Sequence, residues 1–312
     1  KIQSIMIDVF IDGKEGTTGL QIFDRLAKRA DVRVITLPEE LRKDPEARRE
    51  KINAADVVFL CLPDAAARES VSLCENQSVT IIDASTAHRT DPLWAYGFPE
   101  LSAEHRSKIA SSRRIAVPGC HASGFIALVY PLVAAGIVAP DYPFVCYSVT
   151  GYSGGGKKMI AEYESSDRSI LVDSPRQYGL TQLHKHLPEM RAVCGLDDVP
   201  VFSPIVSDYY CGMCVTVPLH ARLLHKKRSL NELKTYFAEY YASSNFVKVT
   251  DPEPYMAANA LAGSNEMHIS VAGNDERPLL LALFDNLGKG ASGAAVQCMN
   301  IALGLDERTS LL

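Results

Sequence analysis

Cys120 is the residue in this chain whose surroundings could produce a reactive thiolate. A short apolar strand is predicted over 115–117, Pro118 and Gly119 end it, and a mostly apolar helix is predicted from Ser123 onward. Cys120 is therefore expected at a helix N-terminus, where free N–H groups and the helix dipole lower a thiol pKa from about 8.5. The same N–H groups can stabilise an oxyanion on a carbonyl that the sulfur attacks. The alternative is a buried structural cysteine.

A second group with chemical potential is the pair of imidazoles at His184 and His186, followed by the carboxylate of Glu189. In an extended segment, residues two apart face the same way, so we expect both rings to point into one site. An imidazole titrates near neutral pH, and it suits a cysteine nucleophile as an acid or base partner. No third zinc ligand follows at helical spacing, and the pair Cys211 and Cys214 has no second pair, so no metal is expected.

A glycine turn near the N-terminus indicates a phosphate-binding loop. A strand predicted over 5–11 is followed by Gly13, Gly16 and Gly19 and then by a helix predicted from Leu20. In this order the backbone can approach a pyrophosphate and the helix N-terminus meets it. The spacing is not the common Gly-x-Gly-x-x-Gly, and a simple tight turn is the alternative.

The second predicted strand, 32–36, has no acidic residue at its end to hold a ribose hydroxyl. Arg42 and Lys43 follow a few residues later, which favours NADP over NAD. Further strands are predicted over 56–62 and 79–83, with a helix opening at Pro63. Strands that alternate with helices indicate a doubly wound parallel sheet, whose ligands bind beyond the carboxyl ends of its strands.

Pro63, Ser85 and Arg89 follow the carboxyl ends of these strands. Arg89 could hold a carboxylate or phosphate through two hydrogen bonds, or it could be an ordinary ion-paired arginine.

The pattern changes after Cys120. Alternating strands and one helix indicate an α+β domain: strands 144–150, 201–206, 213–217 and 268–272, and a helix over 230–241.

Two more glycine-rich segments lie in the second half of the chain. The segment 151–157, which contains Ser153, is expected to be a flexible loop that cradles an anion, or else a linker. A strand over 279–285 precedes a glycine turn at 286–293 and a helix from Ala294. We expect that last helix to pack on the first domain.

Composition limits the class of protein. The chain has 312 residues, 47% of them apolar and 22% charged, which is typical of a globular protein and excludes fibrous and disordered classes. The net charge of −5 and the lack of a basic stripe argue against a nucleic-acid partner. Eight cysteines are too few for a disulfide scaffold. No apolar run has membrane-spanning length and no signal peptide is visible, so we expect a soluble cytoplasmic protein without a membrane partner.

Five motifs occur in an order that resembles the shorter type of the N-acetyl-γ-glutamyl-phosphate reductase family of arginine biosynthesis. They are Gly13-x-x-Gly16-x-x-Gly19, Pro118-Gly-Cys120-His, Ser153-Gly, His184-Lys-His186-x-Pro-Glu189 and Gly288-Lys-Gly-Ala-Ser-Gly293-x-x-x-Gln297. The resemblance covers nearly the whole chain and extends to the aspartate-semialdehyde dehydrogenase-like enzymes. Many relatives have Asn in place of Val117 and Ala in place of Ser292, and neither difference removes a reactive group.

The resemblance implies a Rossmann-type doubly wound domain over 1–119, completed by the C-terminal segment 287–312, and an α+β catalytic and oligomerisation domain over 120–286. It implies NADPH-dependent reduction of N-acetyl-γ-glutamyl phosphate to the semialdehyde through a thioester on Cys120, in a dimer or tetramer. His184 or His186 would handle the proton. Residues expected to bind the dinucleotide are Gly13, Gly16, Thr17, Thr18, Gly19, Pro63, Ser85 and Asn286; those expected to bind substrate are Arg89, Ser153 and Glu189.

Other functions remain possible at this point. The substrate could be another acyl phosphate, such as aspartyl phosphate or a carrier-linked glutamyl phosphate. The chain could also be a dinucleotide-binding regulator without catalysis, but such a protein needs neither Cys120 nor the two histidines. A cysteine hydrolase has no use for two glycine turns in Rossmann-like surroundings.

Overall fold

The computed structural model describes residues 6–14 and 16–312 and divides into two compact units. The first unit is Lys1–Pro118 with Ala291–Leu312, and the second unit is Gly119–Gly290. Ile5 of the predicted first strand and Glu15 of the predicted glycine turn lie outside the described residues. Within the described ranges, no helix is both long enough and apolar enough to span a bilayer.

The first unit contains a six-stranded sheet in which every pair of neighbours is parallel, in the order β2-β1-β3-β4-β6-β5. All residues of β3 and β4 are buried, because helices cover both faces of such a sheet. The predicted doubly wound sheet is confirmed. Its strands are β1 (Ile7–Asp12), β2 (Val32–Ile35), β3 (Val57–Leu60), β4 (Thr80–Asp83), β5 (Ala95–Tyr96) and β6 (Arg114–Ala116).

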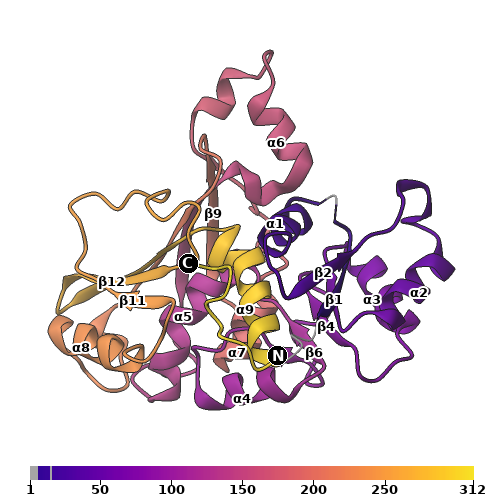
Figure 1. Ribbon diagram of the computed structural model, residues 1–312. Helices are drawn as coiled ribbons and strands as arrows, with labels where there is room; N and C mark the ends of the chain where they lie inside the picture. The colour runs from indigo at the N-terminus through magenta and orange to yellow at the C-terminus, as the bar shows by residue number, and fades with distance from the viewer. Residues whose placement is uncertain (1–5, 15) are drawn as a thin grey trace. The chain divides into compact units, whose positions relative to one another are not determined.

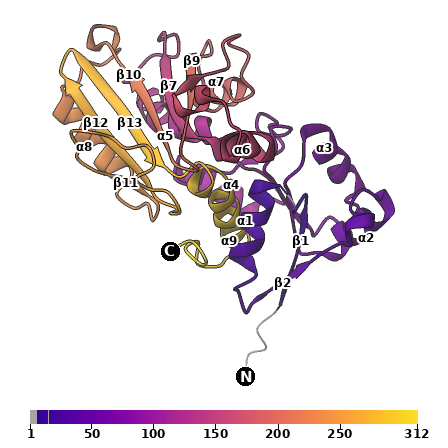
Figure 2. The ribbon, with the colours of Figure 1, turned by 90° about the horizontal axis from the view of Figure 1, so that it is seen from above.

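The helices of the first unit are α1 (Thr17–Leu26), α2 (Pro45–Ala54), α3 (Asp64–Leu73), α4 (Ala103–Ser111) and α9 (Gly293–Ala302), with a 3₁₀ turn η1 (Glu39–Leu41). Figure 2 shows α1 and α9 on one face of the sheet and α2 and α3 on the other. Helix α9 contacts α1, α4 and β4.

Helix α1 begins at Thr17, three residues before the predicted start at Leu20. Gly16 is its N-cap in an extended conformation, and Gly19 lies within the first turn. A Cβ atom on Gly19 would lie 2.5 Å from the carbonyl oxygen of Gly13, so only glycine lets the turn pack this closely on the helix. Gly19 therefore allows the turn at Gly13 to pack on α1, and the helix includes Gly19 although glycine is a poor helix former.

The second unit contains a mixed seven-stranded sheet in the order β11-β12-β13-β10-β7-β9-β8, as the alternating strands predicted. Strand β10 is antiparallel to both β13 and β7, whereas β7 is parallel to β9. The strands are β7 (Val145–Gly151), β8 (Arg176–Gln177), β9 (Val201–Ser207), β10 (Met213–Pro218), β11 (Val247–Val249), β12 (Met267–Asn274) and β13 (Arg277–Phe284).

The α-helices of this unit are α5 (Cys120–Ala134), α6 (Gly156–Glu164), α7 (Leu187–Cys194) and α8 (Leu230–Tyr240). Short turns of 3₁₀ helix are η2 (Tyr152–Gly155), η3 (Ile170–Asp173) and η4 (Ala221–Leu223), and η5 (Gly288–Ser292) is a π-helical turn before α9. Figure 1 shows α5 beneath the sheet of this unit. A Cβ atom on Gly124 would lie 2.5 Å from a methyl carbon of Val215, so glycine lets α5 approach the sheet closely.

The segment 151–157, predicted as a flexible glycine loop, is instead regular structure: Gly151 ends β7, and the residues after it form η2 and the first turn of α6. That prediction was wrong because the glycines here permit close packing. A Cβ atom on Gly151 would lie 2.5 Å from the carbonyl oxygen of Tyr210, and one on Gly155 would lie 2.4 Å from the sulfur of Met159. Helix α6, at the top of Figure 1, follows from this tight turn.

Candidate active site

Cys120 lies at a helix N-terminus, as predicted, but α5 begins at Cys120 itself and not at Ser123, and the side chain of Cys120 is half-buried. Gly119, the N-cap of α5, has no side chain of its own to cap the helix, and the positive end of the helix dipole lies at Cys120. The N–H of Gly119 donates to the buried carboxylate of Glu189 at 3.1 Å. Gly290 packs on the other side, where a Cβ atom would lie 3.0 Å from that of Cys120. The nucleophile candidate is thus held by α7 and by η5.

Several other thiols have surroundings that oppose ionisation. Burial raises the pKa of Cys61 to about 12, and burial with the nearby Asp285 carboxylate raises that of Cys211 to about 11. Burial also raises the pKa of Cys146, Cys194 and Cys214. A raised thiol pKa leaves little thiolate at neutral pH, so these cysteines are poor nucleophiles.

The two predicted histidines lie together, with ring centroids 4.7 Å apart. The geometric premise for this prediction was wrong, since the segment is a turn leading into α7 and not an extended strand. The turn contains Gln182 at φ +57°, and the Gln182 amide is hydrogen-bonded to the backbone N–H and C=O of Phe202. The rings therefore meet because the chain folds back, a feature that residue spacing does not reveal.

The hydrogen bonding of His184 fixes one of its ring nitrogens as an acceptor. The backbone N–H of His186 donates to Nδ1 of His184 at 3.2 Å. A neutral His184 therefore carries its proton on Nε2 and can donate it from there. His186 is the N-cap of α7 and is buried. Because the proton position of His184 is fixed by a backbone hydrogen bond, we favour His184 as the proton donor.

A third imidazole, His121, was not among the predicted site residues. Its ring centroid lies 5.5 Å from that of His184 and 5.6 Å from that of His186. It is buried, and burial together with the charges of His184 and Lys185 lowers its pKa to about 3, so it is neutral. The sequence placed His121 beside Cys120, but its contacts with β7 and with the chain after β8 depend on the fold.

Ser153 and Asn286 are joined to each other. The Asn286 amide donates to Oγ of Ser153 at 3.0 Å, and its carbonyl oxygen accepts from the N–H of Gly212 at 2.7 Å. Both side chains are buried within the second unit. These bonds connect the end of β7 with the start of β10 and with the turn after β13.

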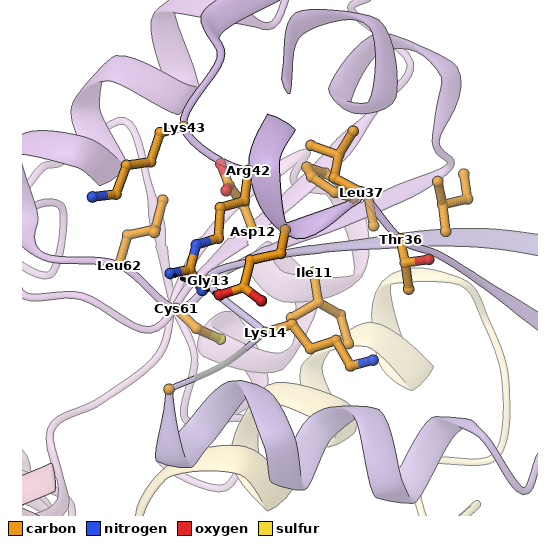
Figure 3. A pocket seen from close by; sticks show the side chains of 14 residues that line it. Ile11, Asp12, Gly13, Lys14, Thr36, Leu37, Arg42, Lys43, Cys61 and Leu62 are labelled. Atoms are coloured by element: carbon orange, nitrogen blue, oxygen red, sulfur yellow. Dashed lines mark ion pairs between the residues drawn. The ribbon is translucent and has the colours of Figure 1, made fainter. Parts of the chain in front are cut away.

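The first unit has a cavity of about 350 Å³ at the carboxyl ends of β1, β2 and β3 (Figure 3). The connection after β1 runs to β2 on one side and the connection after β3 runs to β4 on the other, and a doubly wound sheet binds its ligand at such a switch point. Its lining residues are Phe10, Ile11, Asp12, Gly13, Lys14, Gly16, Ile35, Thr36, Leu37, Glu39, Arg42, Lys43, Cys61 and Leu62. Gly13 has φ +88°, and a Cβ atom there would lie 2.4 Å from the carbonyl oxygen of Cys61.

The cationic lining of this cavity comes from Lys14, Arg42 and Lys43, all labelled in Figure 3. Asp12 adds little free negative charge, because its carboxylate accepts from Nε of Arg48 at 3.2 Å and from the Ser70 hydroxyl at 2.7 Å. This buried ion pair was not predicted, since Arg48 lies on α2 far along the chain. Glu39 forms an exposed ion pair with Arg42 at 3.4 Å.

The other predicted residues of the first unit also follow strand ends. Pro63 is the N-cap of α3. The hydroxyl and the N–H of Ser85 both donate to the buried carboxylate of Asp83 at 2.8 Å. Arg89 donates from Nε to the carbonyl of Val117 at 2.9 Å and from a terminal nitrogen to that of Ala84 at 3.1 Å. Part of its guanidinium therefore holds two loops in place.

Among the described residues, no three His, Cys, Asp or Glu side chains are grouped so that they could hold a metal ion. The chain instead combines a doubly wound unit, with a glycine turn and a cationic cavity, and a unit with a cysteine at a helix start beside histidines. These features are those of a dinucleotide-dependent oxidoreductase, a dehydrogenase or reductase.

Comparison with known sequences agrees with this class. Residues 27–109 match the family described as semialdehyde dehydrogenase, NAD binding domain, and residues 120–286 match semialdehyde dehydrogenase, dimerisation domain. The N-acetyl-γ-glutamyl-phosphate reductase of Burkholderia lata is 47% identical over 95% of this chain and 96% of that relative. N-acetyl-γ-glutamyl-phosphate reductase 2 of Pseudomonas putida is 46% identical over 95% of this chain and 96% of its own length.

The chain therefore belongs to the N-acetyl-γ-glutamyl-phosphate reductase family, and it is an oxidoreductase that contains an NAD(P)-binding domain. The resemblance inferred from the five motifs is confirmed. Solved structures agree on the fold: aspartate semialdehyde dehydrogenase II of Vibrio cholerae has a TM-score of 0.73 at 14% identity, covering 96% of this chain and 99% of its own. The enzyme of Candida albicans with NADP has a TM-score of 0.65 at 16% identity, covering 95% and 98%.

Proposed function

We propose that this chain reduces N-acetyl-γ-glutamyl phosphate to N-acetylglutamate 5-semialdehyde with NADPH, releasing phosphate, as a step of arginine biosynthesis. The observation that carries the proposal is Cys120 at the first turn of α5, in the same unit as the His121, His184 and His186 cluster. The substrate is inferred from the names of the relatives, and the reaction mechanism is inferred from the residues of this chain.

The thiolate of Cys120 attacks the carbonyl carbon of the acyl phosphate. The N–H groups of the first turn of α5 stabilise the oxyanion, the C–O bond to phosphate breaks, and the leaving phosphate takes up one proton. The product is a thioester on Cys120. The reduced nicotinamide, when bound, supplies the hydride that converts this thioester to a thiohemiacetal. His184, which can donate from Nε2, or His186 protonates the thiohemiacetal oxygen and takes the same proton back as the C–S bond breaks, so the aldehyde leaves and the thiolate of Cys120 is restored.

The residues of the first unit fit a dinucleotide, because the N-terminus of α1 follows the glycine turn and the cavity with its cationic lining lies beyond three strand ends. We assign dinucleotide binding to Gly13, Gly16, Thr17, Thr18, Gly19, Pro63, Ser85 and Asn286. Substrate binding is assigned to Arg89, Ser153 and Glu189. Glu189 already accepts from Gly119, so part of its effect is to hold the backbone beside Cys120.

The substrate assignment is tested in the reverse direction. N-acetylglutamate semialdehyde, phosphate and NADP⁺ are expected to give a phosphate-dependent rise in absorbance at 340 nm, whereas aspartate semialdehyde gives little. If NADP⁺ is reduced with aspartate semialdehyde but not with N-acetylglutamate semialdehyde, aspartyl phosphate would replace the proposed substrate. Dinucleotide binding without reduction of either aldehyde would favour a carrier-linked substrate or a regulator.

Selectivity for NADPH over NADH is the second part of the proposal. Lys14, Arg42 and Lys43 line the cavity. Asp12, the acidic residue at the end of β1, is paired with Arg48. An extra phosphate on the ribose would find cationic partners here, and guanidinium groups bind phosphate strongly.

The double replacement of Arg42 and Lys43 by alanine is expected to raise the Kd of NADPH by roughly tenfold or more, because two phosphate contacts are lost. The Kd of NADH should change less than threefold. Fluorescence titration of the bound dinucleotide measures both. Arg49→Ala on α2, which removes two ion pairs outside the cavity, with Glu46 and Glu75, is the matched control. Equal weakening of NADH and NADPH would contradict the assignment.

A homodimer formed through the sheet of the second unit is the third part. On β7 and β9, side chains of one face are apolar and open to solvent: Tyr147 is 47% exposed and Val201 is 58% exposed. Val145 pairs with Val201, Tyr147 with Ser203 and Val149 with Ile205, so this face is apolar except for Ser203. The matched family over 120–286 is described as a dimerisation domain, which favours a second copy as the partner.

Tyr147→Glu is expected to shift the protein from dimer to monomer in light scattering coupled to size-exclusion chromatography, since a buried unpaired carboxylate opposes association. Leu93→Glu replaces an equally apolar side chain that is 82% exposed in the first unit, and it should leave the mass unchanged. A wild-type protein that is monomeric at micromolar concentration would overturn this part of the proposal.

A further inference from the structure

We propose that Gln182 is a positioning residue: its side-chain amide fixes the turn that carries His184, and so keeps this imidazole beside the first turn of α5, where Cys120 lies. The inference rests on the proposed function, in which His184 moves a proton as the thioester is reduced. Gln182 takes no part in the chemistry itself and acts through the placement of His184.

The chain that leads to His184 runs along one edge of β9. Strand β8 is only two residues long and pairs antiparallel with the last part of β9. The N–H of Tyr178 then donates to the carbonyl of Pro204 at 3.1 Å. Further along the same edge, the Gln182 amide donates to the carbonyl of Phe202 and accepts from its N–H, both at 2.8 Å. The side chain of Gln182 therefore takes the place that the backbone of a longer β8 would take.

The backbone of Gln182 needs such support. Its φ of +57° lies in the left-handed region, which among the described residues other than glycine is shared only by Ser310. A residue with a side chain adopts this conformation only where surrounding contacts hold it. Gln182 is exposed, so water could satisfy its amide equally well. The two bonds to Phe202 instead hold the strained turn in one shape.

Phe202 connects these bonds to the imidazole. Its backbone binds Gln182, and the centroid of its buried ring lies 5.1 Å from that of His184. The ring of His184 also meets that of His121 edge-on, with centroids 5.5 Å apart, and His121 follows Cys120 in the first turn of α5. A turn released from Phe202 would let His184 move away from the start of α5.

The ring that His184 meets in α5 is fixed independently of Gln182. His121 is buried, its Nδ1 lies 2.6 Å from the hydroxyl oxygen of Ser148, and its Nε2 lies 2.7 Å from that of Tyr178. A change at Gln182 leaves both of these hydrogen bonds in place. The part that moves is therefore the turn with His184, not the start of α5.

The consequence for the reaction follows from where the proton of His184 lies. The backbone N–H of His186 donates to Nδ1 of His184 at 3.2 Å, so the transferable proton is on Nε2. A general acid must reach the reacting atom within hydrogen-bond distance, and a small displacement lowers the rate more than it lowers substrate affinity. Loss of the Gln182 bonds is therefore expected to lower kcat and to leave KM almost unchanged.

The first test measures kcat and KM for N-acetylglutamate semialdehyde, with phosphate and NADP⁺. Gln182→Met keeps the length of the side chain but removes both hydrogen bonds to Phe202. We expect kcat to fall roughly tenfold and KM to change less than about twofold. Gln177→Met is the matched control, because Gln177 is an exposed glutamine on β8 at the same edge of β9. It should leave both constants unchanged.

A double variant distinguishes an effect through His184 from an independent one. His184→Ala removes the proton donor and is expected to lower kcat by about 10²-fold. If Gln182 acts through His184, adding Gln182→Met to His184→Ala should lower kcat by less than about twofold further. A general weakening of the fold would instead lower kcat by the same factor in both backgrounds.

A further measurement needs neither substrate nor dinucleotide. Diethyl pyrocarbonate acylates the unprotonated nitrogen of a neutral imidazole, and in His184 that nitrogen accepts from the N–H of His186. When the turn is released by Gln182→Met, this hydrogen bond opens more often, and acylation of His184 is expected to become at least about threefold faster. Mass spectrometry of the His184 peptide measures the rate at one pH for wild type, Gln182→Met and Gln177→Met.

Three results would each overturn the inference: an unchanged kcat in Gln182→Met, an equal loss of kcat with and without His184, or an unchanged rate of acylation at His184. If Gln182→Met does not fold, Gln182→Gly decides the question, because glycine tolerates the left-handed backbone and still removes the amide. Failure of the proposed function is seen separately. In that case His184→Ala would retain turnover, whereas the acylation rates would still report whether Gln182 places His184.

Discussion

Cys120→Ser is expected to lower turnover in either direction by roughly 10³-fold or more while leaving the Kd of NADPH within twofold. A serine hydroxyl is not ionised at neutral pH, so the first turn of α5 would have no anion to stabilise and no acyl-enzyme would form. Steady-state rates at 340 nm and a fluorescence titration measure the two quantities.

Cys74→Ser is the matched control, because Cys74 is another half-buried thiol but lies at the end of α3. It should retain full turnover. A Cys120→Ser variant with more than a tenth of wild-type turnover would rule out covalent catalysis at this position.

Gly13→Ala is expected to raise the Kd of NADPH at least tenfold. The added Cβ would lie 2.4 Å from the carbonyl oxygen of Cys61, and φ at this position is +88°, which costs a residue with a side chain about 1–2 kcal/mol. The turn must move to relieve the overlap, and it forms one wall of the cavity. The same titration measures the affinity, and thermal unfolding records the accompanying loss of stability.

Gly195→Ala is the control that distinguishes backbone strain in general from strain in the wall of the cavity. Gly195 also has a positive φ, +66°, but a Cβ atom there would meet no other atom within 4 Å. It ends α7 in the second unit and does not line the cavity. It should lower stability slightly and leave NADPH affinity unchanged. Equal affinities for the Gly13 and Gly195 variants would mean that the glycine turn does not shape the dinucleotide site.

The parts of the fold that were predictable are those with strong local signals. The apolar segments 56–62 and 79–83 predicted buried parallel strands, and β3 and β4 lie within these segments. The position of Cys120 followed from Pro118 and Gly119, which end a strand just before an apolar helix. In these places the hydrophobic pattern and the turn residues agree, so a single interpretation fits both.

The parts that were missed depend on contacts between distant segments. His121 gains its partners from Ser148 on β7 and from Tyr178 after β8, and no spacing rule relates these residues. The glycines at 151–155 were read as flexible because a glycine that permits close packing looks the same in sequence as one that permits motion. Asp12 and Arg48, separated by 36 positions, meet only because α2 packs against the sheet.

The most direct test of the account is to trap the acyl group on Cys120. With N-acetylglutamate semialdehyde and NADP⁺ but no phosphate, the aldehyde adds to the thiol and loses a hydride, which leaves a thioester that cannot be released to phosphate. We expect close to one NADPH per active chain, an intact mass increased by one N-acetylglutamyl group, and that group on the Cys120 peptide. Added phosphate should remove it. Reduction of NADP⁺ without an adduct on Cys120, or an adduct on another residue, would contradict the account.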